Sequence, residues 1–155
     1  MPSIRNIAVG LPVRDGHVLV SESHDAVRDL VFFRAVGGGI EFGERADQAL
    51  RREFREELAV ELDEVGLLGV IENLFTFEGQ PGHEYAHVFA VRSGELDAVP
   101  LDAELVVLDE GSPVRWVPLD TGVPVFPDGV LELLRASGRA PSTTAVRLPR
   151  GPGRV

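Results

Sequence analysis

Residues 37–60 read GGGIEFGERADQALRREFREELAV, a run of glycines followed by a segment of helix-forming composition. Residues 46–59 contain neither Gly nor Pro, so we predict a single helix there. At about 100° per residue the apolar positions of this helix share one sector. They are Ala46, Ala49, Leu50, Phe54 and Leu58. The segment therefore predicts an amphipathic helix that follows directly on a tight glycine turn.

Three glutamates of the predicted helix lie three and four residues apart, which places Glu53, Glu56 and Glu57 on adjacent turns of one face. On the helical wheel Glu57 falls inside the apolar sector and Glu53 falls at its margin. Buried carboxylates without partners cost free energy, and clustered carboxylates raise each other's pKa. A divalent cation resolves both problems, and Mg²⁺ prefers such hard oxygen ligands. The alternative is a salt-bridged surface helix, because Arg51 and Arg55 alternate with these acids.

The spacing of the glycine, the acids and the arginine favours the metal site. From Gly38 the chain reads Gly, five residues, Glu44, seven residues, and then Arg52-Glu53-Phe54-x-Glu56-Glu57-x-Ala59-Val60. This pattern resembles the Nudix box of the Nudix hydrolases at every defining position except Ala59, where the family has Gly. Gly at a helix end serves a left-handed cap, so Ala59 affects stability by about 1 kcal/mol and leaves the ligands intact.

The resemblance implies an α/β/α sandwich, with a mixed sheet between helices, that extends over residues 4–136. It implies a pyrophosphohydrolase of the MutT-like or ADP-ribose pyrophosphatase-like kind, which cleaves a nucleoside diphosphate derivative or a nucleoside triphosphate by attack of water on phosphorus. It also implies Mg²⁺, with Mn²⁺ as a substitute, held by Glu53, Glu56, Glu57 and a glycine-turn carbonyl, that of Gly38. Nudix proteins are commonly dimers, which makes a homodimer the candidate assembly, but the sequence does not determine the oligomeric state.

The resemblance assigns roles to further residues. Arg52 and Glu44 are expected to pair and to orient the catalytic carboxylates. A distal loop often supplies one more carboxylate, and the segment Glu110-Gly111-Ser112-Pro113 before Trp116 is similar to the MutT-like pattern. Glu110 is therefore the first candidate for that carboxylate, and Glu104 is the second.

Strand signals surround the predicted helix. Residues 4–12 and 17–21 flank Asp15-Gly16, which predicts a hairpin, and residues 30–36 lead into the glycines. Residues 65–77 and 84–91 flank a second predicted turn at residues 78–82, while residues 114–118 form a short strand and 128–136 a short helix. We expect loops at residues 23–29 and at the acidic stretch 93–113. Residues 1–137 thus form one domain, and the Pro-, Gly- and Arg-rich residues 138–155 are expected to be a disordered tail.

The second predicted hairpin mixes aromatic and polar side chains that can stack on a base or hold a ribose. We name Glu72, Phe75 and Tyr85 as candidate substrate contacts, although most such residues are simply exposed strand positions. Gly37 and Gly39 are added because a backbone without side chains can approach a phosphate closely. The sequence does not specify which nucleotide is the substrate.

Composition narrows the class of protein. The 155 residues are 44% hydrophobic, which suits one domain with a core, and no apolar run reaches the length of a membrane span. A net charge of −10 argues against duplex nucleic acid as a partner. The absence of Cys excludes disulfides, thiolate catalysis and Cys-ligated zinc. It also fits the reducing cytoplasm, and a chain with Arg but no Lys is typical of a GC-rich bacterial genome.

Three other classes are alternatives. The first is a catalytically silent Nudix domain that senses nucleotides or binds proteins, although such domains typically lose box carboxylates and this chain keeps them. The second is an isoprenoid isomerase-type Nudix enzyme, which needs a Cys that this chain lacks. The third is an acidic calcium-binding protein, whose EF-hand loop has a different spacing of ligands.

Overall fold

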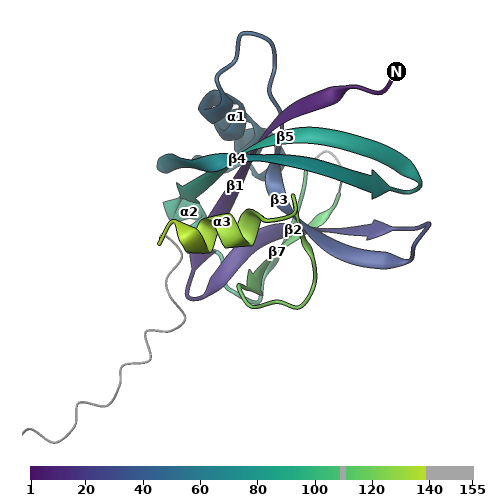
Figure 1. The fold of residues 1–155 in the computed structure, drawn as a ribbon. Coiled ribbons are helices and arrows are strands. Elements are labelled where there is room, and N and C mark those ends of the chain that lie inside the picture. Colours follow the sequence, from purple (N-terminus) through teal and green to yellow (C-terminus); the bar gives the residue numbers. More distant parts are fainter. Residues whose placement is uncertain (109–110, 139–155) are drawn as a thin grey trace, which may run out of the picture.

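The computed structural model describes residues 1–108 and 111–138, and these form a mixed sheet with three helices (Figure 1). Along the chain the elements are β1 (Ile4–Arg14), β2 (His17–Asp25), β3 (Leu30–Gly39), α1 (Ala46–Leu58), β4 (Glu64–Phe77), β5 (Gln80–Arg92), α2 (Gly94–Asp97), β6 (Glu104–Val106), β7 (Pro113–Pro118), β8 (Val125–Phe126) and α3 (Val130–Ala136). No helix in the described part of the chain is long and apolar enough to cross a membrane.

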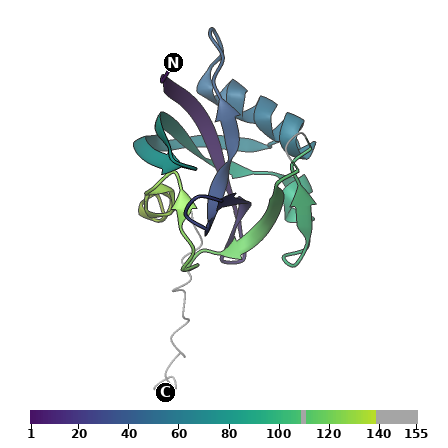
Figure 2. The same ribbon diagram turned by 90° about the vertical axis from the view of Figure 1, so that its right-hand side faces the viewer.

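The sheet has the order β4-β5-β1-β3-β2-β7-β6, and β8 pairs with β3. Strands β1 and β5 run parallel, whereas the other neighbours along this path are antiparallel. Helices α1 and α3 cover opposite faces of the strands, as Figure 2 shows, where α1 and α3 lie on either side of them. The predicted α/β/α sandwich is confirmed.

Successive apolar side chains of the strands point to opposite faces of the sheet, and they form two separate hydrophobic cores. Ile7 and Val9 of β1 face the cluster that contains Leu131 and Leu134 of α3. Ala8, between them, faces the cluster formed with α1. Because successive strand residues point to opposite faces, this parity identifies the side on which every other residue of β1, β4 and β5 lies.

Both predicted hairpins form, and each has a two-residue turn with positive φ at both positions. Asp15 and Gly16 have φ of 48° and 72°, and Glu78 and Gly79 have φ of 50° and 78°. Such turns match the twist of the flanking strands. The second turn is shorter than the predicted five-residue segment, because β5 already begins at Gln80 opposite Phe77.

Helix α1 has the predicted extent. Ala49, Leu50 and Phe54 are fully buried, whereas Leu58 is partly buried against the same core. The helix ends at Ala59, which has φ 55° and ψ 37°, the left-handed conformation that usually calls for glycine.

Two predicted loops were wrong in part. The acidic stretch 93–113 contains α2 and β6, because Leu96 is an apolar anchor for a short helix and Leu105 packs on the α1 core. The polar segment 23–29 begins as strand, since β2 continues to Asp25. The polar side chains of both segments predicted loops, although part of each segment forms regular secondary structure. The predicted tail lies, from residue 139 on, outside the described residues.

Asp25 links the tips of the two long hairpins. Its buried carboxylate accepts hydrogen bonds from the backbone N–H groups of Val27 and Arg28 at 3.0 Å and from Arg28 Nε at 2.9 Å. It also accepts the backbone N–H of Glu78, in the β4–β5 turn, at 3.1 Å. These bonds, that of the Arg28 backbone above all, lower the pKa of Asp25 to about 2. The β2–β3 and β4–β5 hairpins are thus tied together by one carboxylate.

Candidate active site

The tight turn predicted at the glycines is wrong, because Gly37, Gly38 and Gly39 are the last residues of β3 and pair with β1. This glycine-rich strand end, the glycine turn of the sequence pattern, lies against the carboxylate of Glu53. Gly38 pairs with Ala8 of β1 on the face that α1 covers. A Cβ at Gly38 would stand 2.5 Å from the Glu53 carboxyl carbon and from its Oε1 atom. A Cβ at Gly37 would stand 2.0 Å from the carbonyl oxygen of Ala8. The absence of side chains at both positions is what allows β3, β1 and α1 to approach this closely.

Arg52 connects the turn to the acids of the box. Its Nε and Nη2 atoms each donate to Glu44 at 2.9 Å, which is a bidentate pair, and Nη2 also donates to the Gly39 carbonyl at 3.0 Å. Its Nη1 atom donates to Glu53 at 2.9 Å and to Glu56 at 3.3 Å. The predicted pairing of Arg52 with Glu44 is confirmed, and the simple i,i+4 contact with Glu56 is present as well.

The pairing of Arg52 with Glu44 keeps both side chains ionised. The hydrogen bonds from Arg52 lower the pKa of Glu44 to about 2, and the bonds with Glu44 raise the pKa of Arg52. Both side chains are largely enclosed, with 17% of Glu44 and 22% of Arg52 exposed. The pair is therefore charged at all physiological pH values, and it fastens the loop before α1 to the helix.

The three box glutamates differ in exposure. The side chain of Glu53 is 14% exposed and that of Glu56 is 58% exposed, while Glu57 is of intermediate exposure. Among the described residues no group of three or more His, Cys, Asp or Glu side chains is close enough to hold a metal ion. The positively charged guanidinium of Arg52 contacts the carboxylates of Glu53 and Glu56. The donors nevertheless fit Mg²⁺ in kind, because they are carboxylates beside a backbone turn that a Cβ would block.

The segment before β7 approaches the end of α1. The N–H of Leu108 donates to the Glu57 carbonyl at 3.0 Å, and the N–H of Gly111 donates to the Val107 carbonyl at 2.8 Å. Glu110, the first candidate for the distal carboxylate, lies outside the described residues.

Glu104, the second candidate, lies on β6. Its neighbour Leu105 packs against the core beneath α1, so Glu104 points to the opposite face, where its carboxylate is 3.5 Å from Arg115. The structure does not bring Glu104 to the box carboxylates.

The predicted substrate contacts on β4 and β5 fall on two faces. Glu72 and Tyr85 are opposite each other, and the Tyr85 hydroxyl donates to Glu72 at 2.6 Å. His83 lies 3.0 Å from the same carboxylate. The hydrogen bond from Tyr85 has the larger effect on Glu72 and that with His83 the smaller, and both lower the pKa of Glu72. The bond to Glu72 raises the pKa of Tyr85. Phe75 is three residues from Glu72 and therefore points to the other face.

Arg5 is a basic group beside the turn that sequence reasoning missed. Its Nη2 atom lies 3.6 Å from the position a Cβ would take at Gly39. Nothing in the local sequence signals this contact, since the two residues are far apart in the chain and meet only through the pairing of β1 with β3.

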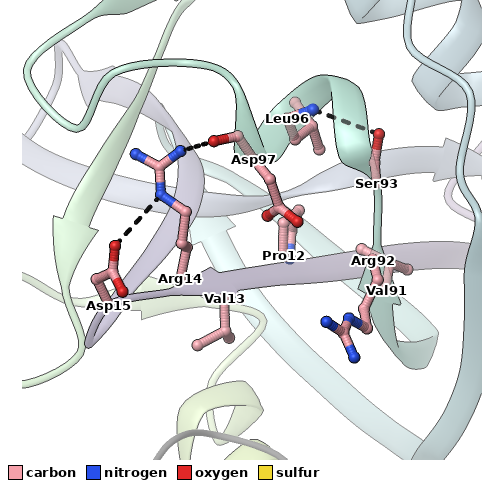
Figure 3. Close-up of a pocket in the computed structure, with 9 residues that line it drawn as sticks. All are labelled: Pro12, Val13, Arg14, Asp15, Val91, Arg92, Ser93, Leu96 and Asp97. Carbon is pink, nitrogen blue, oxygen red and sulfur yellow. Dashed lines mark hydrogen bonds and ion pairs between the residues drawn. The ribbon is translucent and has the colours of Figure 1, made fainter.

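A separate cavity of about 290 Å³ lies at the other end of β1 (Figure 3). Its lining includes Pro12, Arg14, Arg92 and Asp97. The Arg14 guanidinium donates to the Asp97 carbonyl and stacks over Trp116, 5.1 Å from the ring centroid. None of the box residues lines this cavity, so it does not belong to the carboxylate site.

Comparison with known proteins agrees with the geometry of the turn and of α1. A model of the NUDIX domain matches residues 4–134, which is most of the chain. The protein belongs to the Nudix family. The matched region spans every described strand and most of α3, so membership covers the fold as well as the box.

Solved Nudix structures share this fold at low sequence identity. A MutT NUDIX hydrolase from Burkholderia pseudomallei is 22% identical with a TM-score of 0.63, and the alignment covers 85% of this chain and 98% of that one. A NUDIX hydrolase from Nitrosomonas europaea is 20% identical with a TM-score of 0.61, covering 90% and 94% of the two chains. A structure described as an ADP compounds hydrolase is 16% identical with a TM-score of 0.56, covering 89% and 75%.

Membership of the Nudix family supports hydrolysis of a pyrophosphate bond as the general reaction, and Nudix hydrolases generally use divalent metals.

Proposed function

We propose that this protein hydrolyses a pyrophosphate bond in a nucleoside diphosphate derivative or a nucleoside triphosphate, by metal-dependent attack of water on phosphorus. The observation that carries the proposal is the Arg52 network, which joins Glu44, Glu53 and Glu56 to the Gly39 carbonyl. A salt-bridged surface helix does not require a bond from its arginine to the glycines at the end of β3. A catalytic helix does require such an anchor, because its carboxylates must be held in a fixed position relative to the substrate.

Glu53, Glu56 and Glu57, with the carbonyl of Gly38, would hold Mg²⁺, or Mn²⁺ in its place. When bound, the metal would neutralise phosphate charge and lower the pKa of water. One of the three carboxylates accepts the proton of the attacking water through an Oε atom. Arg52 and Glu44 act as positioning residues, since their bonds hold the loop against α1 and keep the Glu53 carboxylate at the turn. Glu110 is retained as the proposed distal carboxylate.

Substrate would lie over the glycine turn and along the β4–β5 hairpin. Gly37 and Gly39 allow a phosphate to approach the backbone, which is a role that a side chain would block. Phe75, Glu72 and Tyr85 stay as proposed contacts with the rest of the substrate. The carboxylate of Glu72 is already engaged by Tyr85, so those two would act as one unit.

We propose a cytoplasmic location from the absence of Cys, and a bacterial origin from the use of Arg without Lys. We propose a homodimer because Nudix proteins commonly form dimers. Light scattering during gel filtration measures the mass of the particle, for which one chain contributes 16.8 kDa.

The proposal is tested by measuring phosphate or nucleotide release from ADP-ribose, NADH, dinucleoside polyphosphates, nucleotide sugars and nucleoside triphosphates, with and without Mg²⁺. We expect Mg²⁺-dependent cleavage within this panel. Glu57→Gln should abolish turnover and leave the circular dichroism spectrum unchanged. Glu61→Gln is the matched control, because Glu61 is an exposed acid just beyond the helix that pairs with Arg55. Equal loss in both variants, or full activity in Glu57→Gln, would contradict the role of Glu57.

A further inference from the structure

Two buried polar side chains of the β4–β5 hairpin take no part in the site described above. Asn73 is 6% exposed and Glu84 is 4% exposed. The two residues are opposite each other in register, so their side chains lie side by side on one face. That face also carries Ile71 and Ala86, which belong with the α3 core. Within the described residues neither side chain makes a hydrogen bond.

A buried carboxylate in this state calls for an explanation. Burial of a charge without hydrogen bonds is unfavourable. Arg5 lies opposite Glu84 on β1, and its Nη1 atom is 3.8 Å from Oε1, too far for a hydrogen bond. Arg5 is itself 56% exposed. The acceptor capacity of Glu84 is therefore available to a ligand.

The pair is continuous with the active site. Arg5, next to Glu84, approaches Gly39, and the Gly39 carbonyl accepts the hydrogen bond of Arg52. Glu84 lies on β5, two strands away from Gly39 on β3, which corresponds to roughly 10 Å at the usual strand spacing. Glu84 is on the face that α3 covers, whereas the box carboxylates are on the α1 side, so a molecule bound at the box would reach Glu84 by passing around the end of β3 at Gly39, where Arg5 lies.

An aromatic ring flanks the pair. Phe75 is two residues beyond Asn73 and so lies on the same face, opposite Gly82. Its ring atoms come within 2.2–2.7 Å of the position that a Cβ would occupy at Gly82. The absence of a side chain at Gly82 thus leaves room for the Phe75 ring on the face that carries Glu84. An acceptor, an amide and an aromatic ring side by side are the groups that bind a heteroaromatic base.

We propose that Glu84 and Asn73 recognise the base of the substrate, and that they favour a base with an exocyclic amino group beside a ring nitrogen, as in adenine or cytosine. This inference rests on the proposed function. An ionised carboxylate only accepts hydrogen bonds, so Glu84 accepts the amino N–H while the Asn73 amide donates to the ring nitrogen. Hypoxanthine and uracil would place a carbonyl oxygen against the carboxylate and a ring N–H against the amide donor.

The test compares kcat/KM for pairs of nucleotides that differ at this group, ATP with ITP and CTP with UTP. Wild type should favour the amino member of each pair by about 10- to 100-fold, the range for losing a hydrogen bond to a charged group. Glu84→Gln offers an amide N–H in place of an acceptor, and should abolish or reverse the preference. Asn73→Ala, the second variant should Glu84→Gln fail to fold, should also reduce it.

Glu64→Gln is the matched control, since Glu64 is an exposed glutamate at the other end of β4. It should keep the wild-type preference. An unchanged preference in Glu84→Gln, or equal kcat/KM for both members of each pair in wild type, would overturn the inference while leaving the proposed hydrolysis standing.

Binding of AMP and IMP measured by calorimetry separates the inference from the reaction. If no nucleotide is hydrolysed, the proposed function fails. Tighter binding of AMP than of IMP by wild type, lost in Glu84→Gln, would still support base recognition. Equal binding of AMP and IMP, or binding of neither, would overturn it.

Discussion

Replacing Ala59 by glycine should stabilise the protein. Ala59 has the left-handed backbone conformation at φ 55° and ψ 37°, which costs a residue with a Cβ about 1–2 kcal/mol. Glycine removes that cost, but its greater freedom in the unfolded chain takes back about 0.5–1 kcal/mol. Ala59 is exposed, and its N–H bond to the Arg55 carbonyl at 3.0 Å does not depend on the side chain. The net gain is roughly 0.5–1 kcal/mol, or about 1–4 °C in Tm.

The same substitution at Ala98 is the control. Ala98 also ends a helix and is also exposed, but its φ of −80° and ψ of −12° are ordinary for any residue. Ala98→Gly should therefore lose about 0.5–1 kcal/mol. Urea unfolding of the two variants gives both free energies, with the slope m as a check that the unfolded states are alike. A loss of stability in Ala59→Gly, or an equal gain in Ala98→Gly, would refute the argument from backbone strain.

Substitution of Gly38 and of Gly37 by alanine should have different effects. Gly38→Ala should fold and lose about 10- to 100-fold in kcat, because its Cβ displaces the mobile end of the Glu53 side chain. Gly37→Ala should instead lose about 3 kcal/mol of stability, because its Cβ meets a backbone carbonyl at 2.0 Å; thermal melts measure the loss of stability and steady-state kinetics the loss of kcat. Arg52→Lys should lower kcat by about 10- to 100-fold with nearly unchanged Tm, since Lys cannot make the bidentate bond; unchanged kcat would remove its positioning role. The pKa of Asp25 is lowered from 3.8 to about 2, so its stabilisation is complete above about pH 4 and is lost as the pH falls toward 2. Asp25→Asn should melt at lower temperature at pH 7 and show a flatter dependence of Tm on pH, and parallel curves for the two proteins would contradict this.

The local sequence is sufficient for the helix and for both hairpin turns. The period of the apolar residues in 46–59 predicted α1, which spans Ala46–Leu58, and Asp15-Gly16 predicted the first tight turn; the second hairpin was predicted, but its turn is Glu78-Gly79 and not the whole of residues 78–82. These features depend on residues within a few positions of one another, where steric and hydrogen-bond preferences act directly. The loops predicted at 23–29 and 93–113 were wrong in part, because β2 pairs with β3 as far as Asp25, β6 pairs with β7, and the polar side chains of these segments give no sign of that pairing.

For the proposed site, the resemblance to the Nudix box supplied the candidate carboxylates and the expected pairing of Arg52 with Glu44, and that pairing is present in the structure. The sequence by itself therefore determined the family and the sandwich fold. Only the tertiary structure placed Arg5 opposite Glu84 and brought it to the glycines at the end of β3. The reason is physical: the register between β1 and β5, which are far apart in the chain, follows from burial of whole faces, and no short segment encodes it.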